Sequence, residues 1–435
     1  MFLIPLIRKK EMESRVRFEQ SFYNSDAKFN ISHYQFRTFN NLWQNIQLNV
    51  PFYKEMVKKK EIPTQISSFH DFENFPILNR EYVRSNIDML YDYSKKPDGW
   101  VRTGGSTGNP LIYPNWKEEK KNYEPNLWYA RDFYNINRAD KMFRLWGHSH
   151  TLGKGLSKIK KEIAFAIGHP LIGYKRFSAY DLSEGKMKEA GNKILQFKPD
   201  YIIGYSKALR VLAEVNKDKS SLFHKLKFKA VIGAAEGFES YKDKEYLSEI
   251  FGCPVGLEYA SMETKMLAHT HPDGTYKVLW RNNLVESVDN YEVPSNTGKI
   301  LVTSLYKRAF PLIRYNLGDI IEGTRKDKIS VYEFERIQGR DNDFLWLDKF
   351  TPIHSEGITH AIKYSNKITA YQIRYTKDNI YTIYVKANTG LTKKDITEIK
   401  NRLVQVDSRL ETLEIIQTDK LKQTIAGKTK WLIKE

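Results

Sequence analysis

Helical and strand-like stretches alternate regularly in the middle of the chain, from residue 183 to residue 259. Apolar residues at helical spacing predict helices at 183–197, 207–215 and 239–250, and apolar runs between them predict strands at 201–205, 230–233 and 255–259. Strands joined through helices need crossover connections, which are right-handed and give a parallel sheet. The sequence therefore predicts an α/β core, and in such sheets ligands bind beyond the carboxyl ends of the strands.

Several of these strand ends carry candidate substrate-binding residues. A strand expected at 141–146 ends at Trp146 and is followed by His148, and an imidazole at a strand end can line a pocket. The next two strands end near Tyr205 and Ala234. Ser206, directly after the strand at 201–205, is expected to cap the following helix.

A loop rich in glycine and hydroxyl groups precedes this core. The segment Thr103-Gly104-Gly105-Ser106-Thr107-Gly108 has three glycines and three hydroxyls within six residues. Glycine tolerates the positive φ values that turn successive backbone N–H groups toward one anion, so the loop suits a polyphosphate. No Gly-Lys-Ser/Thr closes the loop as in a Walker motif, and its glycine spacing differs from the dinucleotide fingerprint.

The same loop fits the G-x-S-x-G pattern of a hydrolase nucleophile elbow, with Ser106 as the nucleophile. An elbow opens directly into a helix. Here Pro110 is followed by the run Leu111-Ile112-Tyr113-Pro114, and an apolar run that has a proline on each side predicts a strand. A serine hydrolase remains an alternative at this stage.

Composition places the chain among globular proteins. Its 435 residues, 41% hydrophobic and 13% aromatic, can form two or more domains. The single cysteine, Cys253, excludes a disulfide framework and suits a reducing cytoplasm. No apolar run approaches ~20 residues, so no transmembrane segment is expected. The net charge of +18 is spread along the chain without a nucleic-acid-binding module, so no nucleic-acid partner is expected.

The two ends of the chain differ from its core. The apolar run at 2–7 precedes the charges of Arg8-Lys9-Lys10, the reverse of a signal peptide, so it is expected to pack on the body, with peripheral membrane contact as the weaker alternative. Residues 13–95 read as mainly helical, and 275–335 as short strands that include a run at 311–315. Beyond residue 340 the pattern becomes a smaller α+β type, with a helix from about 392 that Thr392 and Asp395 could cap.

Segments from across the chain together resemble the adenylate-forming enzymes, a superfamily of acyl-CoA synthetases, luciferases and adenylation domains. The resemblance lies in the glycine loop, Gly233–Glu236, Tyr259–Glu263, Tyr315–Asp319, Gly339-Arg340 and, near the end of the chain, Gly427-Lys428. The segments at 50–53, 145–147, 198–200 and 204–205 resemble the phenylacetate–CoA ligase-like branch, and within it most the capsular-polysaccharide-biosynthesis type. Each motif is weak alone, whereas the set in register is specific.

The resemblance implies an α/β protein with a large N-terminal domain (1–340) of mixed and parallel sheets with flanking helices, and a small mobile α+β C-terminal domain (341–435). It implies an ATP-dependent, AMP-forming ligase that activates a small carboxylic acid. The acceptor would be coenzyme A, an amine or a sugar, and a role in surface polysaccharide biosynthesis and a cytoplasmic location are expected.

Roles for individual residues follow from the same resemblance. The β- and γ-phosphates would be held by the glycine loop, that is by Thr103, Gly104, Gly105, Ser106, Thr107 and Gly108. The nucleotide would be contacted by Ala235, Glu236 and Tyr259, and its ribose by Asp319 with support from Arg340. Glu263 would bind Mg²⁺, and Lys428 would bridge the substrate carboxylate and the α-phosphate.

Several positions depart from the family pattern. Asn109 stands where the loop often has lysine, Ala234-Ala235 replaces a glycine pair, and Asn342 replaces the usual hinge aspartate. A degenerate, non-catalytic relative that binds glycans or nucleotides therefore stays open. Some relatives carry a structural zinc, for which Cys253, His269 and His271 are the chemically suitable residues, but one thiolate at this spacing argues against it.

Overall fold

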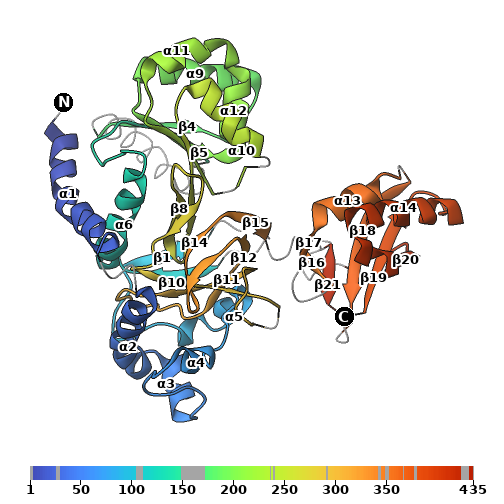
Figure 1. Cartoon of the computed structure of the whole chain (residues 1–435), viewed down its shortest axis with the longest axis horizontal. Coiled ribbons are helices and arrows are strands. Elements are labelled where there is room, and N and C mark those ends of the chain that lie inside the picture. Colours follow the sequence, from blue (N-terminus) through green and yellow to red (C-terminus); the bar gives the residue numbers. More distant parts are fainter. Residues whose placement is uncertain are drawn as a thin grey trace. The chain divides into compact units, whose positions relative to one another are not determined.

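The structure is a computed structural model. It describes residues 3–25, 30–103, 111–147, 172–235, 237–238, 241–290, 292–340, 344–347, 352–365, 367–376, 380–422 and 431–434. The chain divides into two compact units (Figure 1). The first comprises Met1–Ser287, Ile300–Leu317 and Ile321–Ile337, and the second comprises Val288–Lys299, Gly318–Ile320 and Gln338–Glu435.

A nine-stranded sheet forms the centre of the first unit, with the order β13-β14-β9-β8-β7-β6-β5-β3-β4. The strands from β4 to β7 are parallel, and those from β7 to β13 are antiparallel. The parallel half confirms the predicted alternation. The strands are β3 (Met142–Trp146), β4 (Tyr174–Ser178), β5 (Tyr201–Tyr205), β6 (Ala230–Ala234), β7 (Val255–Ser261), β8 (Lys265–Thr270), β9 (Tyr276–Val278), β13 (Arg325–Asp327) and β14 (Ser330–Phe334).

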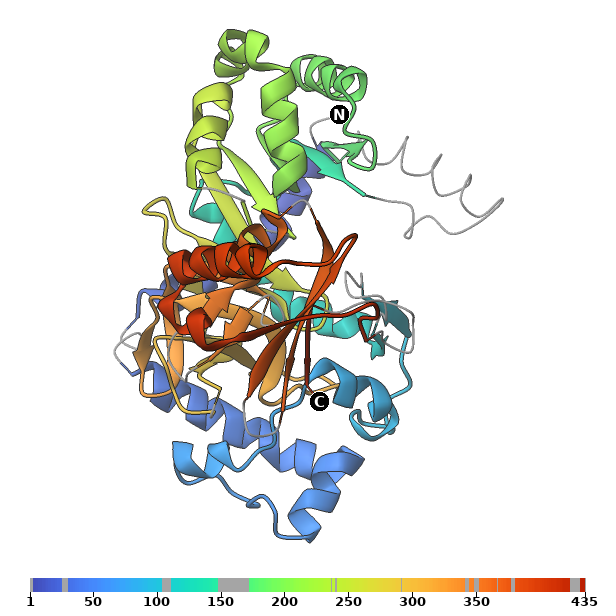
Figure 2. The ribbon, with the colours of Figure 1, turned by 90° about the vertical axis from the view of Figure 1, so that its right-hand side faces the viewer.

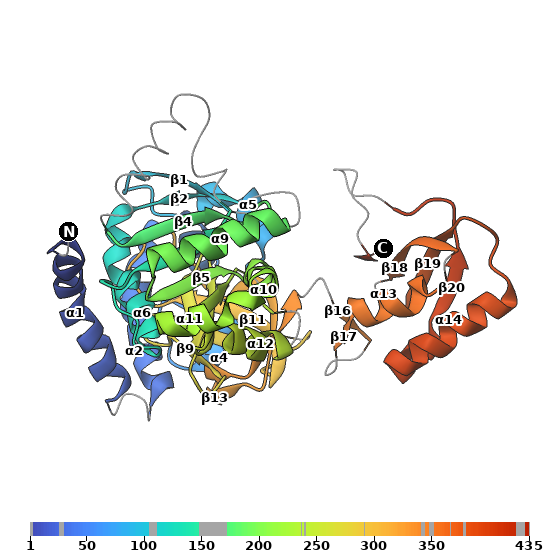
Figure 3. The ribbon, with the colours of Figure 1, turned by 90° about the horizontal axis from the view of Figure 1, so that it is seen from above.

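Helices cover both faces of the parallel half because its strands are apolar on both sides. Ile202 packs with one apolar cluster and the next residue, Ile203, with another, as the two-residue period of a strand requires. Helices α9, α10, α11 and α12 lie on one side of this part of the sheet and contribute to the first cluster, and α6 and α1 lie on the other side and contribute to the second (Figures 1 and 3). These helices are α1 (Leu3–Tyr23), α6 (Lys120–Asp132), α9 (Glu184–Phe197), α10 (Ser206–Val215), α11 (Ser220–Leu226) and α12 (Tyr241–Phe251).

Helix α10 approaches β5 closely because Gly204 has no side chain. A Cβ at Gly204 would lie 2.9 Å from the Leu145 carbonyl oxygen and 3.1 Å from Leu209 Cγ on α10. We expect Gly204→Ala to lower the free energy of unfolding by about 1–3 kcal/mol, since the backbone contact cannot relax without disturbing the β3–β5 pairing. A lower urea midpoint would report this. Gly185→Ala on α9, where nothing lies within 4 Å, is the matched control and is expected to be neutral or slightly stabilising.

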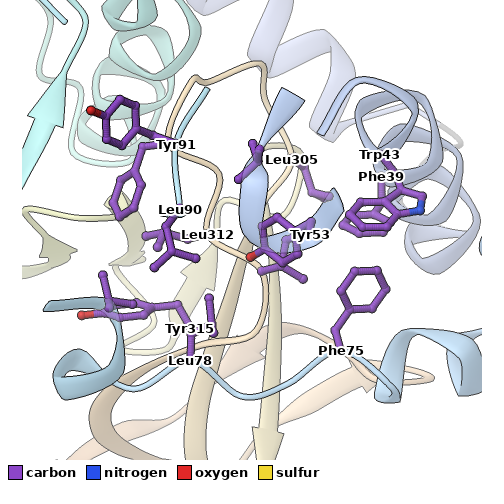
Figure 4. Close-up of a cluster of buried hydrophobic side chains, with 14 of the residues drawn as sticks. Phe39, Trp43, Tyr53, Phe75, Leu78, Leu90, Tyr91, Leu305, Leu312 and Tyr315 are labelled. Carbon is purple, nitrogen blue, oxygen red and sulfur yellow. The ribbon is translucent and has the colours of Figure 1, made fainter. Parts of the chain in front are cut away.

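The remainder of the first unit is built on an aromatic cluster around Phe39, Trp43, Tyr53 and Phe75, to which Tyr315 also belongs (Figure 4). It joins α2 (Ile31–Asn49), α3 (Pro51–Lys58), α4 (Phe69–Glu73) and α5 (Arg80–Ser85) to the hairpin of β1 (Gly99–Arg102) and β2 (Ile112–Asn115). A four-stranded sheet has the order β10 (Asn283–Val288), β11 (Thr297–Ser304), β12 (Tyr315–Glu322) and β15 (Arg336–Arg340).

The second unit contains a small α+β arrangement, as predicted. Its four-stranded sheet has the order β20 (Glu414–Gln417), β19 (Tyr381–Ala387), β18 (Ile368–Tyr375) and β21 (Leu432–Lys434), with α13 (Ser355–Lys363) and α14 (Lys393–Val406) beside it (Figures 2 and 3). A separate hairpin pairs β16 (Phe344–Trp346) with β17 (Pro352–His354). The predicted capping box is confirmed, because the Thr392 hydroxyl accepts from the Asp395 N–H at 3.3 Å and the Asp395 carboxylate accepts from the Thr392 N–H at 2.7 Å.

Two local predictions are wrong. The run at 311–315 is not a strand before Tyr315, because Pro311 cannot donate a ladder hydrogen bond and Arg314 turns the chain at φ +48°. Ser206 is the first residue of α10 rather than its cap, a position that Tyr205 occupies. Among the described residues, no helix is long and apolar enough to cross a membrane.

Candidate active site

Glu263 is a buried carboxylate at the tip of the hairpin formed by β7 and β8. Only 6% of its surface is exposed, although hairpin tips normally face solvent. The turn is fixed by the Ser261 hydroxyl, which accepts from the Thr264 N–H at 3.0 Å. A carboxylate that loses its hydration on burial needs hydrogen-bond partners, and the partners of Glu263 come from distant parts of the chain.

Two tyrosines hold the turn. Tyr315, whose ring is part of the aromatic cluster in Figure 4, donates its hydroxyl to Glu263 Oε1 at 3.4 Å. Tyr113, on β2, donates its hydroxyl to the Met262 carbonyl. Burial raises the pKa of both phenols and the Glu263 charge raises each further, so both stay protonated and can donate. The turn is therefore oriented by rigid, buried donors.

The base of the glycine loop lies on the same framework. Thr103 and Leu111 close the β1–β2 hairpin, with the Thr103 N–H donating to the Leu111 carbonyl at 2.9 Å and the Leu111 N–H donating to Thr103 Oγ1 at 2.9 Å. Arg80, at the start of α5, also donates to Thr103 Oγ1. The predicted loop residues Gly104, Gly105, Ser106, Thr107 and Gly108 lie outside the described residues.

Backbone hydrogen bonds connect the base of the glycine loop, at Thr103, with the part of the chain that binds Glu263. Leu78 pairs with the start of β12, donating its N–H to the Arg314 carbonyl at 3.1 Å and accepting from the Asn316 N–H at 2.9 Å. Arg80 follows two residues later and reaches Thr103, while Tyr315 reaches Glu263. The positively charged Arg80 and the negatively charged Glu263 are thus placed by one continuous set of contacts.

Lys265 adds a second cation next to this carboxylate. Its ammonium donates to the Met262 carbonyl at 2.7 Å and to the Tyr113 hydroxyl at 3.4 Å. Burial, assisted by repulsion from Arg308, lowers the pKa of Lys265 to about 8, against the opposing effect of Glu119 and Glu263. The charge of Lys265 therefore changes within the pH range in which enzymes are ordinarily assayed.

Three of the predicted substrate-binding residues form one row across the parallel sheet. Tyr205 and Ala234 are partners in the β5–β6 register, and the ring centres of Tyr205 and Trp146 lie 4.4 Å apart. The row lies at the carboxyl ends of β3, β5 and β6. The fourth residue, His148, lies outside the described residues.

Ala235 continues this row into a strained backbone position. Its φ is +70°, a value that glycine adopts freely and that costs other residues free energy. It stands where the resemblance predicts glycine, a residue that would adopt this φ without strain. Backbone strain of this kind is often found at functional turns.

The other predicted site residues are placed as follows. Tyr259 is 8% exposed on β7, with its ring centre 6.2 Å from that of Phe334, so little of its surface is accessible. Asp319 is half-buried on β12, and Arg340 ends β15. Glu236 and Lys428, like Asn342 of the expected hinge, lie outside the described residues.

Glu263 is the residue of this site whose carboxylate could hold a metal ion. No group of three or more potential metal ligands occurs in the part of the chain that the structure describes. One carboxylate fits Mg²⁺, which usually takes one or two protein carboxylates and completes its shell with phosphate oxygens and water. Burial raises the pKa of the Cys253 thiol to about 12, which disfavours the thiolate form that zinc requires.

Sequence reasoning missed Arg80, Tyr113 and Lys265. None of the three belongs to a recognised motif. Arg80 and Tyr113 act through contacts distant in sequence, with Thr103 and with Met262, whereas Lys265 contacts Met262 within the same turn. The nucleophile-elbow alternative loses support, since the chain enters strand β2 at Ile112 instead of a helix.

Comparison with known proteins gives distant relatives over most of the chain. No family model matches. Protein CapK of Staphylococcus aureus is 22% identical over 377 residues, covering 85% of this chain and 81% of CapK. Phenylacetate-coenzyme A ligase of Escherichia coli (strain K12) is 21% identical over 409 residues, covering 85% and 86%.

Among solved structures, an open conformation of 2-hydroxyisobutyryl-CoA ligase, in complex with 2-HIB-AMP and CoA, matches with a TM-score of 0.64 and 17% identity. The match covers 92% of this chain and 91% of the ligase. A second structure of that ligase, in its thioesterification state, matches with a TM-score of 0.59. These likenesses establish the fold.

Proposed function

From its fold, which is that of the adenylate-forming ligases, and its distant relationship to CapK and phenylacetate–CoA ligase, we propose that this chain activates a small carboxylic acid with ATP and Mg²⁺. The products of this step are acyl-adenylate and pyrophosphate. The acyl group then passes to coenzyme A, an amine or a sugar. The observation that carries the proposal is the set of hydrogen bonds that connects the base of the glycine loop at Thr103 with the buried carboxylate of Glu263.

The chemistry needs positive charge and hydrogen-bond donors where negative charge accumulates. Glu263 would hold Mg²⁺, which neutralises phosphate oxygens when bound, and Tyr315 keeps that carboxylate oriented. Arg80 supplies a guanidinium at the base of the phosphate loop, which offsets the missing lysine at Asn109. Glu263 thereby provides the negative charge for the metal ion, and Arg80 provides the positive charge for the phosphates.

Further roles come from the resemblance. We propose that Asp319 accepts from the ribose hydroxyls with support from Arg340, that Ala235 and Glu236 contact the nucleotide, and that Tyr259 flanks the adenine. The row of Trp146, Tyr205 and Ala234, with His148, binds the acid. Lys428 would stabilise the charge that develops between carboxylate and α-phosphate. The division of the chain near residue 338 supports a separate C-terminal domain at 341–435 that carries this lysine.

The acceptor decides the biological role. The solved complex of 2-hydroxyisobutyryl-CoA ligase contains CoA, which supports a thioester product. The sequence resemblance to capsular-polysaccharide-biosynthesis proteins supports a sugar acceptor instead, in a pathway that builds surface polysaccharide. We place the reaction in the cytoplasm, where ATP and CoA are available, with peripheral membrane contact through the N-terminal segment as a secondary proposal.

The direct test is pyrophosphate release over a panel of carboxylic acids, with and without coenzyme A and amines. Acid-dependent release is expected with at least one acid. A serine hydrolase using Ser106 would instead be labelled by a fluorophosphonate probe in the folded protein. A non-catalytic glycan-binding relative would show no thermal shift with ATP, since ligand binding to the native state must raise the midpoint.

Lys265 gives the ATP affinity a predictable pH dependence. Because the pKa of Lys265 is about 8, a positive charge near Glu263 is present at pH 7 and mostly lost at pH 9. We expect ATP binding to weaken by roughly 3- to 10-fold over this interval in the unmodified protein. Calorimetric titration of Lys265→Met should show a flatter pH dependence and weaker binding already at pH 7. Equal slopes for both proteins would contradict the assignment.

A further inference from the structure

Arg144 lies in the middle of β3, on the sheet face that carries the row of Trp146 and Tyr205. Its guanidinium carbon lies 4.5 Å from the centre of the Trp146 ring, and that ring in turn contacts the Tyr205 ring, with the two planes inclined at 40°. The Nε atom of Arg144 is buried and has no hydrogen-bond partner. Within the described ranges, no hydrogen bond or ion pair joins the side chain of Arg144 to another residue.

The surroundings of Arg144 are rich in positive charge. Arg176 is its register partner on the edge strand β4, and Arg131 reaches the same face from α6. Glu258 is the carboxylate nearby, but it already binds Arg131, Oε1 to Nε, at 2.6 Å, with both side chains 9% exposed. Burial first, then Arg176 and Arg131, lower the pKa of Arg144, while Glu258 and Tyr205 oppose the shift.

This arrangement is costly unless an anion arrives. A cation withdrawn from water loses hydration that contact with an aromatic face only partly replaces. Like charges at paired positions of neighbouring strands repel one another as well. Among the described residues, the carboxylate close to Arg144 is that of Glu258, and its ion pair is with Arg131, so the Arg144 side chain keeps its capacity to bind an anion.

We propose that Arg144 binds a second anionic group of the acid substrate, which makes the substrate a dicarboxylic acid or an acid that carries a phosphate. The inference rests on the proposed function, because it places the acid along the row of Trp146 and Tyr205. Arg144 precedes Trp146 by two positions, about 6.6 Å along a strand. In the proposed substrate, the two anionic groups are separated by an apolar part that lies against the rings of Trp146 and Tyr205.

Matched pairs of acids test the assignment. Pyrophosphate release and calorimetric binding without ATP are measured for hexanoate against adipate and for phenylacetate against 4-carboxyphenylacetate. A third arm, 4-(phosphonooxy)phenylacetate, distinguishes a carboxylate from a phosphate as the second group. We expect the unmodified protein to prefer the dianionic member of a pair by at least about 10-fold, the range of a charge-assisted hydrogen bond.

Variants then test whether the preference for dianionic acids depends on Arg144. Arg144→Met, which keeps the length of the side chain, should reduce the ratio of dianionic to monoanionic substrate by roughly 10- to 100-fold, and Arg144→Lys should retain part of it. Arg210→Met is the control, because Arg210 also stacks on an aromatic ring, 4.0 Å from the centre of the Tyr246 ring, but lies on α10 outside the row. Thermal midpoints verify that each variant is folded.

The outcomes separate this inference from the proposed function. Equal use of both members of each pair by the unmodified protein, or an unchanged ratio in folded Arg144→Met, overturns the role of Arg144 and leaves acid activation standing. No pyrophosphate release with any acid counts against the proposed function. The calorimetric ratio still decides in that case whether Arg144 binds a second anion.

Discussion

Glu263→Gln is expected to lower acid-dependent pyrophosphate release by roughly 100- to 1000-fold while changing the thermal midpoint little. The amide is the same size as the carboxylate and can still accept the hydrogen bond from Tyr315, which lies 3.4 Å from Oε1. What it loses is the negative charge that would hold Mg²⁺. A coupled pyrophosphate assay over a range of Mg²⁺ concentrations measures the loss, and the half-saturating Mg²⁺ concentration should rise.

A matched carboxylate elsewhere in the same sheet provides the control. Glu333 on β14 is buried to a similar degree, at 8% exposed, and is paired with Lys277 and Arg325. Glu333→Gln should leave the Mg²⁺ dependence unchanged. Tyr315→Phe, which removes the orienting hydroxyl but keeps the buried ring, should reduce activity less than Glu263→Gln. Activity of Glu263→Gln within about threefold of the unmodified protein at saturating Mg²⁺ would remove the metal from this residue.

The fold could be predicted from the sequence where local pattern and tertiary environment agree. The strand Tyr201–Tyr205 is a continuous apolar run that the structure buries on both faces, and the helix Glu184–Phe197 has apolar residues on its buried face, so these local patterns are sufficient to predict both elements. The run at 311–315 has a strand-like composition but is turned by Pro311 and by the backbone of Arg314. Arg314 is held by the carbonyls of Glu73 and Phe75, at 2.8 and 3.1 Å, contacts that no local pattern contains.

The candidate site could be predicted only in outline. The sequence singles out Thr103 and Glu263 through motifs, but it does not show that Arg80 binds one or that Tyr315 binds the other. The structure adds these links because α5, β2, β12 and the β7–β8 turn meet in three dimensions. The unsatisfied Nε of Arg144 was equally hidden, because an arginine within a strand has the same sequence signature whether or not its guanidinium is hydrogen-bonded.

Lys428→Ala is expected to lower kcat for pyrophosphate release by roughly 100- to 1000-fold, with a much smaller change in KM for ATP. Lys428 lies outside the described residues, so this prediction rests on the resemblance of Gly427-Lys428 to the Gly-Lys of adenylate-forming enzymes. In that role the ammonium meets charge that develops between the carboxylate and the α-phosphate during the reaction. An interaction made chiefly in the transition state affects kcat, whereas one made equally with bound ATP affects KM. Steady-state kinetics with the best acid of the panel separate these two cases.

The neighbouring Lys430→Ala is the control for general loss of positive charge, because it removes a lysine two positions along the same segment. It should retain most of the activity if position 428 is specific, and both variants should lose activity similarly if only the net charge of +18 attracts the nucleotide. Raising the ionic strength distinguishes the same alternatives, since a long-range attraction is screened by salt and a direct contact in a closed site is screened much less. A kcat undiminished in Lys428→Ala would reject the assignment, while the roles of Glu263 and Arg80 would stand, because their contacts do not involve this lysine.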